Sequence, residues 1–189
     1  MTEIDIKEIV ENLIDTFLKA GKISLELRKK GLIKKMKPDN TPVSNGDLEV
    51  NEIITKKILQ LTPNIPIVSE ETSENKSKNN LKNFWLIDPI DGTYDYINNL
   101  DEFTINAGLI IEKKPAAGLI YAPAKNRMFY SYGENLAFEL IDGKAIKLTG
   151  SKNFNLNEIK FVSYSNKIKP EIEKIHNNLN VKKYDRMKS

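Results

Sequence analysis

Apolar residues recur at helical spacing along the N-terminal part of the chain. Residues three to four positions apart lie on one face of an α-helix, so this spacing predicts a long amphipathic helix over residues 4–30 that packs on a sheet. Gly31 is a typical end for such a helix. The positions that carry the pattern are Ile6, Val10, Leu13, Phe17 and, after Gly21, Leu25.

Two polar segments interrupt the apolar pattern before residue 83. Residues 34–42 are basic and contain two prolines, and residues 72–82 are almost free of apolar side chains. Both are therefore predicted to be mobile loops. Between them, Ser44 and Asp47 have the spacing of a capping box, which predicts a second helix that ends near Leu61.

The apolar period changes to two after Leu100, which predicts a meander of antiparallel strands. Asp142-Gly143 is a typical hairpin turn and leads into a further predicted strand at 145–148. Residues 170–177 are predicted to form a helix. The other predicted strands cover residues 65–68, 84–87, 103–111, 117–121, 128–132, 136–141, 160–163 and 181–184. The pattern as a whole predicts an α/β protein in which long helices cover one face of a mainly antiparallel sheet.

The composition is typical of a globular protein. The chain has 189 residues, of which 40% are hydrophobic and 29% are charged, enough to bury a substantial core. The absence of cysteine excludes disulfides, thiolate catalysis and cysteine metal sites, and favours a cytoplasmic location. No apolar run is long enough to predict a transmembrane segment, and the charged N-terminus does not resemble a secretory signal.

The net charge of +3 comes from dispersed lysines and not from a basic block. A small positive excess mildly favours an anionic ligand. The sequence has no basic stripe interleaved with aromatic residues, so a nucleic-acid partner is not expected.

The run from Trp85 to Thr93, with the sequence WLIDPIDGT, carries the most chemical information. An apolar stretch ends in Asp88 and Asp91, and the proline between them stiffens the chain. Carboxylates fixed in this way can bind hard cations, and backbone N–H groups at the start of a following helix can bind phosphate. A strand end followed by an ordinary helix cap is the alternative interpretation of the same pattern.

Other charged positions are candidates for the same site. Glu70 and Glu71 follow a predicted strand, although paired glutamates are usually solvated. Asp47 is the third residue after Ser44 in the predicted capping box and has a structural role on that ground alone. Lys37 and Asp39 fall in the first polar segment, where exposure to solvent is the default.

The WLIDPIDGT run resembles the signature of the inositol monophosphatase superfamily, whose members are metal-dependent phosphatases. The similarity spans nearly the whole chain and implies a layered α/β sandwich of the sugar-phosphatase type. It also implies that the first polar segment closes over the site and brings Lys37 and Asp39 near metal or phosphate. The segments that resemble the CysQ-type branch, the 3'(2'),5'-bisphosphate nucleotidases, are residues 37–44 with Asp47, 69–71, 102–106 and 121–123.

The resemblance implies a magnesium site. Glu70, Asp88, Asp91 and the backbone carbonyl of Ile90 would bind Mg²⁺, which prefers oxygen ligands. A bound metal lowers the pKa of water, so no histidine base is required. The single histidine, His176, is accordingly predicted to be a surface residue of the 170–177 helix.

The resemblance also implies how the substrate is bound. Gly92 and Thr93 would hold the phosphate through their N–H groups, next to Asp91. The Thr93 hydroxyl, near Glu70 and Asp47, would orient the attacking water. These three residues, Glu70, Thr93 and Asp47, are thus the expected catalytic groups.

The activity implied is a Mg²⁺-dependent hydrolase that removes the 3'-phosphate of adenosine 3',5'-bisphosphate, a small phosphate ester linked to sulfur metabolism. An inositol-1-phosphate or sugar phosphatase is the alternative enzyme. A degenerate fragment that binds metal weakly, or an interaction module, is the alternative outside enzymes.

One departure from the resemblance concerns the C-terminal part. Such proteins carry a further Trp-Asp-x-Ala motif that completes a second metal site, but Trp85 is the only tryptophan in this chain. The expected organisation is a metal- and phosphate-binding domain at 1–155 and the start of a truncated α/β domain at 156–189, with most of the second half missing. Impaired activity is expected, with a homodimer or a complementing C-terminal fragment as possible partners.

Overall fold

The computed structural model describes residues 3–72, 80–150, 160–163, 168–179 and 183–186. The chain forms two compact units, Met1–Leu148 and Thr149–Ser189. The predicted domain boundary after residue 155 lies outside the described residues. No helix within the described residues is both long enough and apolar enough to cross a membrane.

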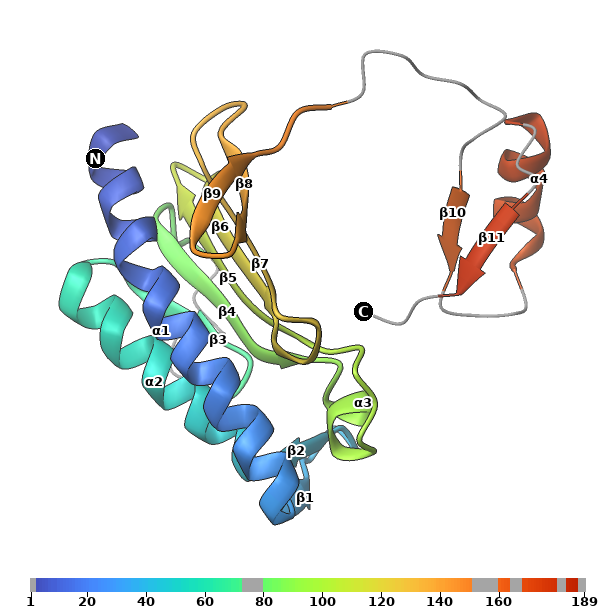
Figure 1. The fold of residues 1–189 in the computed structure, drawn as a ribbon, viewed down its shortest axis with the longest axis horizontal. Coiled ribbons are helices and arrows are strands. Elements are labelled where there is room, and N and C mark those ends of the chain that lie inside the picture. Colours follow the sequence, from blue (N-terminus) through green and yellow to red (C-terminus); the bar gives the residue numbers. More distant parts are fainter. Residues whose placement is uncertain (1–2, 73–79, 151–159, 164–167, 180–182, 187–189) are drawn as a thin grey trace. The chain divides into compact units, whose positions relative to one another are not determined.

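The strands of the first unit form a seven-stranded sheet in the order β3-β4-β5-β6-β7-β8-β9. Neighbouring strands are antiparallel except for β3 and β4, which are parallel. Helices α1 (Glu3–Lys30) and α2 (Asn45–Leu61) lie side by side against one face of the sheet (Figure 1). The strands are β3 (Ile67–Ser69), β4 (Phe84–Asp91), β5 (Thr104–Ile111), β6 (Lys114–Ala122), β7 (Arg127–Tyr132), β8 (Ala137–Ile141) and β9 (Lys144–Lys147). The predicted α/β fold, with helices on a mainly antiparallel sheet, is confirmed.

Alternation along the strands determines which face the helices cover. In β4, Trp85 and Ile87 are buried, whereas Leu86 between them is 53% exposed on the opposite face. The buried side chains join the apolar stripe of α1, to which Phe17 belongs, in one core. The indole N–H of Trp85 donates to the hydroxyl of Thr62 at 3.0 Å, so the one polar group of this side chain is satisfied within the core.

The ends of both long helices follow from local sequence. After Lys30, Gly31 adopts φ +95°, a left-handed conformation that favours glycine. At the start of α2, the Ser44 hydroxyl accepts a hydrogen bond from the Gly46 N–H at 3.1 Å. The Asp47 carboxylate in turn accepts one from the Ser44 N–H at 2.8 Å. The predicted capping box is therefore present, and it fixes Asp47 at the N-terminus of the helix.

The segment 34–42, predicted to be a loop, contains a short β-hairpin. Strand β1 (Lys34–Met36) pairs antiparallel with β2 (Pro42–Ser44). The Lys37 N–H donates to the Thr41 carbonyl at 2.8 Å and closes the turn. Strands of three residues are too short to produce a period-two pattern, which is why the sequence did not reveal them. Most of the second predicted loop, residues 73–79, lies outside the described residues.

Strand β4 continues through both aspartates and does not end at Ile87 as predicted. Asp88 pairs with Asn106 of β5 and Asp91 pairs with Thr104, with a register shift between the two pairs. Such a bulge accommodates Pro89, which has no N–H to donate to a neighbouring strand. The backbone of both aspartates is therefore held by sheet pairing.

The second unit contains β10 (Lys160–Ser163), α4 (Pro170–Asn178) and β11 (Lys183–Arg186). The two strands are parallel, so with the intervening helix they form a β-α-β unit. The strand predicted at 181–184 is displaced towards the C-terminus, and residues 181–182 lie outside the described residues. His176 is only 8% exposed and its ring packs 4.5 Å from that of Phe161. The predicted surface position of His176 is therefore wrong, because the ring takes part in packing between α4 and β10.

Replacing Gly46 with alanine is expected to destabilise the first unit by about 2 kcal/mol. A Cβ atom at this position would overlap the Tyr96 side chain, whose hydroxyl donates to the buried carbonyl of Ser24 at 2.6 Å. Urea denaturation followed through the fluorescence of Trp85 measures the loss. Gly150→Ala is the matched control, because a Cβ there meets nothing within 4 Å. Equal stability of the two variants would contradict the predicted overlap.

Candidate functional site

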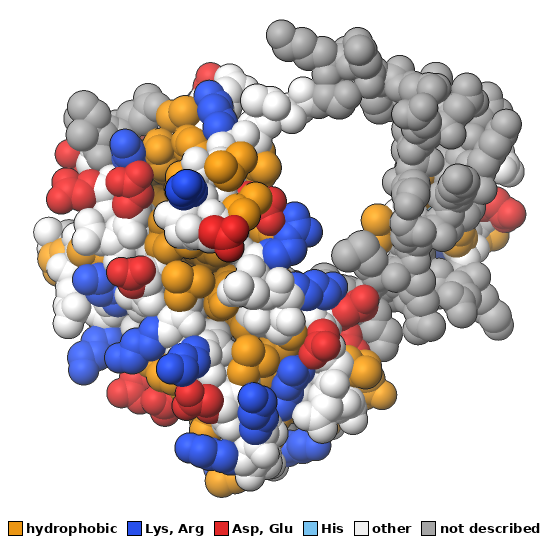
Figure 2. Space-filling model, viewed as in Figure 1, with side chains coloured by type: hydrophobic (Ala, Val, Ile, Leu, Met, Phe, Trp, Pro, Cys, Tyr) orange, Lys and Arg blue, Asp and Glu red, His pale blue; other side chains and the backbone are white. Residues whose placement is uncertain are grey.

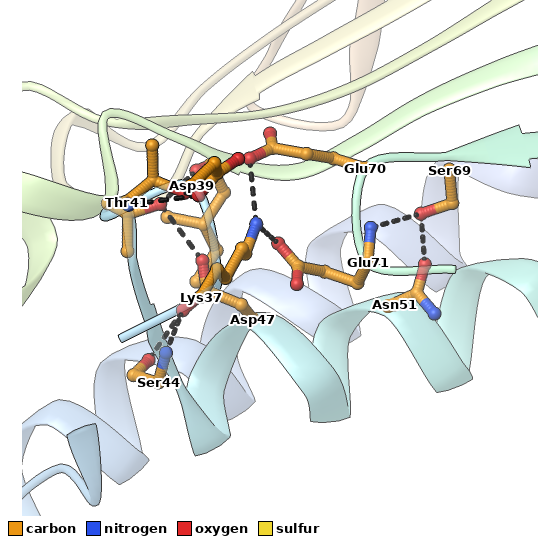
Figure 3. Close-up of polar contacts among 11 residues, drawn as sticks. Lys37, Asp39, Thr41, Ser44, Asp47, Asn51, Ser69, Glu70 and Glu71 are labelled. Atoms are coloured by element: carbon orange, nitrogen blue, oxygen red, sulfur yellow. Dashed lines mark hydrogen bonds and ion pairs between the residues drawn. The ribbon is translucent and has the colours of Figure 1, made fainter. Parts of the chain in front are cut away.

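Glu70 lies beside Asp88 because β3 and β4 are parallel neighbours. Ser69, the last residue of β3, pairs with Ile87, and the Glu70 N–H donates to the Ile87 carbonyl at 3.0 Å. The Ser69 hydroxyl donates to the side chain of Asn51 on α2 at 2.6 Å and anchors the end of the strand (Figure 3). Two acidic residues that are remote in sequence are thus brought to one end of the sheet.

The carboxylates at this end of the sheet are crowded. Burial, the charges of Glu70 and Asp91, and a hydrogen bond to Glu70 together raise the pKa of Asp88 to about 7, with burial as the largest cause. One carboxylate oxygen of Asp88, Oδ1, is buried and has no hydrogen-bond partner within the described residues. The cluster therefore has a concentration of negative charge that its own hydrogen bonds leave partly uncompensated.

Lys37 reaches this cluster from the β1–β2 hairpin. Its ammonium group lies 2.9 Å from Glu70 Oε1 and 2.7 Å from Glu71 Oε1 (Figure 3). The Lys37 and Glu71 side chains are 17% and 5% exposed, so the second ion pair is nearly buried. These ion pairs bring the segment that contains Lys37 to the acidic residues, as predicted. The Asp39 carboxylate instead accepts hydrogen bonds from the backbone N–H and the hydroxyl of Thr41, within its own turn.

The two partners of the nearly buried ion pair respond differently to their surroundings. Burial lowers the pKa of Lys37, but its hydrogen bonds to Glu71 and Glu70 outweigh burial, and the pKa is raised. At Glu71, burial raises the pKa and outweighs the opposing effect of Lys37. We conclude that the ammonium stays charged and that the pair offsets only part of the energy needed to bury Glu71.

Thr93 links the N-terminus of α2 to the end of β4. Its hydroxyl lies 3.0 Å from Asp47 Oδ1 and 3.0 Å from the Ile90 carbonyl, so its one proton is shared between two acceptors. Burial raises the pKa of Asp47, and the hydrogen bonds from Ser44 and Thr93 oppose that rise. One hydroxyl group thus joins the turn between β4 and α3 to the start of α2, which is distant in sequence.

Gly92 allows the chain to turn directly from β4 into the short helix α3 (Thr93–Ile97). It adopts φ +90°, which a residue with a side chain rarely tolerates. The N–H groups of Gly92 and Thr93 belong to this turn, immediately after Asp91. The turn therefore places possible phosphate donors next to the carboxylates.

The residues present fit a divalent cation such as Mg²⁺. Carboxylates and a backbone carbonyl are hard oxygen donors, and the buried Oδ1 of Asp88, which has no partner among the described residues, needs a hydrogen-bond donor or a cation. Across the described parts of the chain, no three acidic or histidine side chains are arranged as a complete metal-ligand group. The Glu70 carboxylate is paired with the Lys37 ammonium at 2.9 Å (Figure 3). The roles predicted for Glu70, Asp88, Ile90 and Asp91 remain predictions.

Comparison with known proteins places this geometry in a family. Residues 5–187 match the inositol monophosphatase family. The chain belongs to that family.

The chain resembles three known proteins in sequence or in structure. The 3'(2'),5'-bisphosphate nucleotidase CysQ of Aggregatibacter actinomycetemcomitans is 33% identical over 142 residues, which are 74% of this chain and 53% of that protein. The crystal structure of CysQ from Bacteroides thetaiotaomicron is 25% identical, with a TM-score of 0.70 over 94% of this chain and 70% of the other. An IMPase/NADP phosphatase complexed with Mg²⁺ and phosphate is 18% identical, with a TM-score of 0.71 over 94% and 66% of the two chains, and shows likeness of fold alone.

The chain spans about half the length of the curated CysQ relatives it matches. Within the family, the resemblance inferred from the WLIDPIDGT run is confirmed, as is the similarity to the CysQ branch. The activity of these longer relatives therefore remains a proposal for this chain.

Two side chains of the site had no assigned role from sequence. Asn51 anchors Ser69 and so positions the residue that follows, Glu70. Asn106 pairs with Asp88 across the sheet, and its Oδ1 is buried without a partner in the described part of the chain. Asn106 belongs to the 102–106 segment that resembled the CysQ branch, which is the only signal that could have singled it out.

Replacing Lys37 with methionine is expected to tighten Mg²⁺ binding by about fivefold or more, because the ammonium competes for Glu70 and repels a nearby cation. Isothermal titration calorimetry with Mg²⁺ measures the change. Lys35→Met is the matched control: it removes the same charge from an exposed position on the same hairpin. Weaker binding by the Lys37 variant than by the Lys35 variant would show that Lys37 assists the cation.

Proposed function

We propose that the chain is a Mg²⁺-dependent phosphomonoesterase that removes the 3'-phosphate of adenosine 3',5'-bisphosphate. The observation that carries the proposal is the crowding of Asp88 by Glu70 and Asp91, with an unpartnered carboxylate oxygen, next to the Gly92–Thr93 turn. Such an arrangement favours the binding of a cation at the carboxylates and of an anionic group at the adjacent turn. The similarity to bisphosphate nucleotidases, which reaches 33% identity, supports this substrate class.

The proposed roles follow from the contacts of each residue. Glu70, Asp88, Asp91 and the Ile90 carbonyl would hold Mg²⁺. The bound ion would neutralise charge on the phosphate and make water a better nucleophile. The N–H groups of Gly92 and Thr93 would bind phosphate oxygens, next to Asp91, and orient the ester for in-line attack.

Thr93 and Asp47 would handle the proton of the attacking water. Because the Thr93 hydroxyl donates towards Asp47, its oxygen has a lone pair free to accept a hydrogen bond from that water. Burial raises the pKa of Asp47, which makes its carboxylate a better proton acceptor. As the bond from water to phosphorus forms, the bond from phosphorus to the ribose oxygen would break, and Thr93 Oγ1 would guide the proton of the water towards Asp47. The ribose oxygen would leave with the bonding electron pair and take a proton from solvent water.

Phosphate release tests this proposal directly. The chain is incubated at saturating Mg²⁺ with adenosine 3',5'-bisphosphate and, separately, with inositol 1-phosphate, and inorganic phosphate is measured with time. We expect kcat/KM to be at least about tenfold higher for the bisphosphate, and release to stop with EDTA. A preference for inositol 1-phosphate would instead support the alternative phosphatase of the same family.

Absence of release with both substrates would contradict the enzymatic proposal. If Mg²⁺ still bound to the chain, that result would favour an inactive fragment that retains a metal site. Sedimentation of the chain alone would test the predicted homodimer. Addition of the C-terminal part of a CysQ relative during the assay would test the predicted complementing fragment.

A further inference from the structure

We propose that Asn106 is a positioning residue of the carboxylate site and that its side-chain amide donates a hydrogen bond to Asp88. The inference rests on the proposed function, because it concerns how Asp88 is oriented to receive a cation. It starts from two buried oxygens without hydrogen-bond partners in the described residues, Asp88 Oδ1 and Asn106 Oδ1. They belong to residues that pair directly across β4 and β5.

The pairing puts the two side chains within reach of each other. Residues directly opposite on antiparallel strands point to the same face, and their Cβ atoms lie about 4.5–5.5 Å apart. Two buried acceptor oxygens so placed are unfavourable, because each has lost its hydrogen bonds to water. A half-turn of the Asn106 amide about the Cβ–Cγ bond exchanges its oxygen and nitrogen with little change in shape. An N–H donor then occupies the position of the buried oxygen.

The hydrogen bond would have a definite consequence for Asp88. The interaction with Glu70 involves one side of the Asp88 carboxylate, while Oδ1 lacks a partner. A donor from Asn106 would hold one oxygen and fix the plane of the carboxylate, leaving the other oxygen directed towards Glu70 and the cation. Hydrogen bonds of this kind to ligating carboxylates commonly change metal affinity by about 10–100-fold.

A direct ligand role for Asn106 Oδ1 is the competing assignment, and the two roles need different atoms. A positioning role needs the N–H donor, which aspartate lacks. A ligand role needs only the acceptor oxygen, which aspartate keeps and supplies with charge. Asn106→Asp therefore separates the two roles, while Asn106→Leu removes both at nearly constant size.

The test measures Mg²⁺ affinity by isothermal titration calorimetry on the 189-residue chain. We expect Asn106→Leu and Asn106→Asp each to weaken binding by at least about fivefold. Ser131→Ala, on the same open face of the sheet but on β7, is the matched control and should change affinity by less than about twofold. Unchanged affinity in Asn106→Leu would overturn the proposal. Unchanged or tighter binding in Asn106→Asp would also overturn it, and would assign a ligand role.

A second measurement does not depend on metal. Urea denaturation in EDTA of Asp88→Ala, Asn106→Ala and the double variant forms a double-mutant cycle, followed through the single tryptophan, Trp85. We expect the two sites to be coupled by at least about fivefold in the folding equilibrium constant. If the chain without substitutions bound no Mg²⁺, the proposed function would fail. The coupling energy would then be the only test of the hydrogen bond between Asn106 and Asp88. Independent effects of the two changes would show that Asn106 does not donate to Asp88.

Discussion

Replacing Asp88 with asparagine is expected to abolish Mg²⁺ binding and, at the same time, to stabilise the metal-free chain at pH 8. Burial, Glu70 and Asp91 raise the pKa of the Asp88 carboxyl to about 7 in the folded chain, against about 3.9 in an unfolded one. The folded state therefore holds this proton more tightly than the unfolded state. Between about pH 4 and pH 7, the metal-free protein should lose stability as the pH rises.

The neutral amide of asparagine removes this unfavourable ionisation. Because Asp88 remains partly accessible and its neighbours are screened by solvent, we expect a gain of only about 1–2 kcal/mol at pH 8. Urea denaturation in EDTA at pH 5 and pH 8 measures it, with the fluorescence of Trp85 as the signal. Asp142→Asn is the matched control, since it makes the same change in an exposed turn. A loss of stability that is equal at the two pH values would contradict the electrostatic explanation.

Replacing Thr93 with valine is expected to reduce phosphate release by at least about a hundredfold while leaving Mg²⁺ affinity nearly unchanged. Valine keeps the shape of threonine but removes the hydroxyl that contacts both Asp47 and the Ile90 carbonyl. The attacking water would lose its orienting partner, whereas the proposed cation ligands would stay in place.

Phosphate release and calorimetric Mg²⁺ binding, measured on the same samples, separate these two effects. Thr93→Ser is the control, because serine retains the hydroxyl and should retain most of the rate. A parallel loss of rate and Mg²⁺ affinity in Thr93→Val would show that the hydroxyl supports the metal site and not the water. A wild-type rate would exclude Thr93 from catalysis.

The elements with strong local patterns could be predicted from sequence. The alternation of Ile105, Ala107 and Leu109 determines one buried face of β5, and the structure confirms it. The spacing of Ser44 and Asp47 predicted the capping box in the same way. In both cases, residues a few positions apart carry the whole signal, so no tertiary information is required.

The parts of the site that depend on tertiary pairing could not be derived from local pattern. The contact of Lys37 with Glu70 and Glu71 requires both the β1–β2 hairpin and the parallel pairing of β3 with β4. Asp88 pairs with Asn106 in the register of β4 and β5, and Asp91 pairs with Thr104 only after a bulge whose position no short-range pattern specifies. The predicted surface position of His176 was wrong for a related reason. Its packing against the ring of Phe161 is a tertiary contact, which the residue pattern of the helix does not indicate.

The charged side chains on the face seen in Figure 2 are of mixed sign, so this face as a whole would not attract an anionic substrate. Lysine, arginine and acidic side chains alternate across the face seen in Figure 2 and do not form a block of one sign. The attraction of a phosphate ester would therefore depend on the few groups at the end of β4. The carboxylates of the proposed Mg²⁺ site, and not the net charge of +3, would therefore determine where such a substrate binds.

The most direct test of the proposed Mg²⁺ site is a calorimetric Mg²⁺ titration of the chain near pH 6.5, repeated in buffers with different ionisation enthalpies. Because the pKa of Asp88 is raised to about 7, a large fraction of this carboxyl is protonated before the cation binds. The account predicts saturable binding that releases most of one proton per chain, and loss of both the binding and the proton release in Asp88→Asn. Absence of saturable binding at millimolar Mg²⁺, or identical titrations of the two proteins, would contradict it.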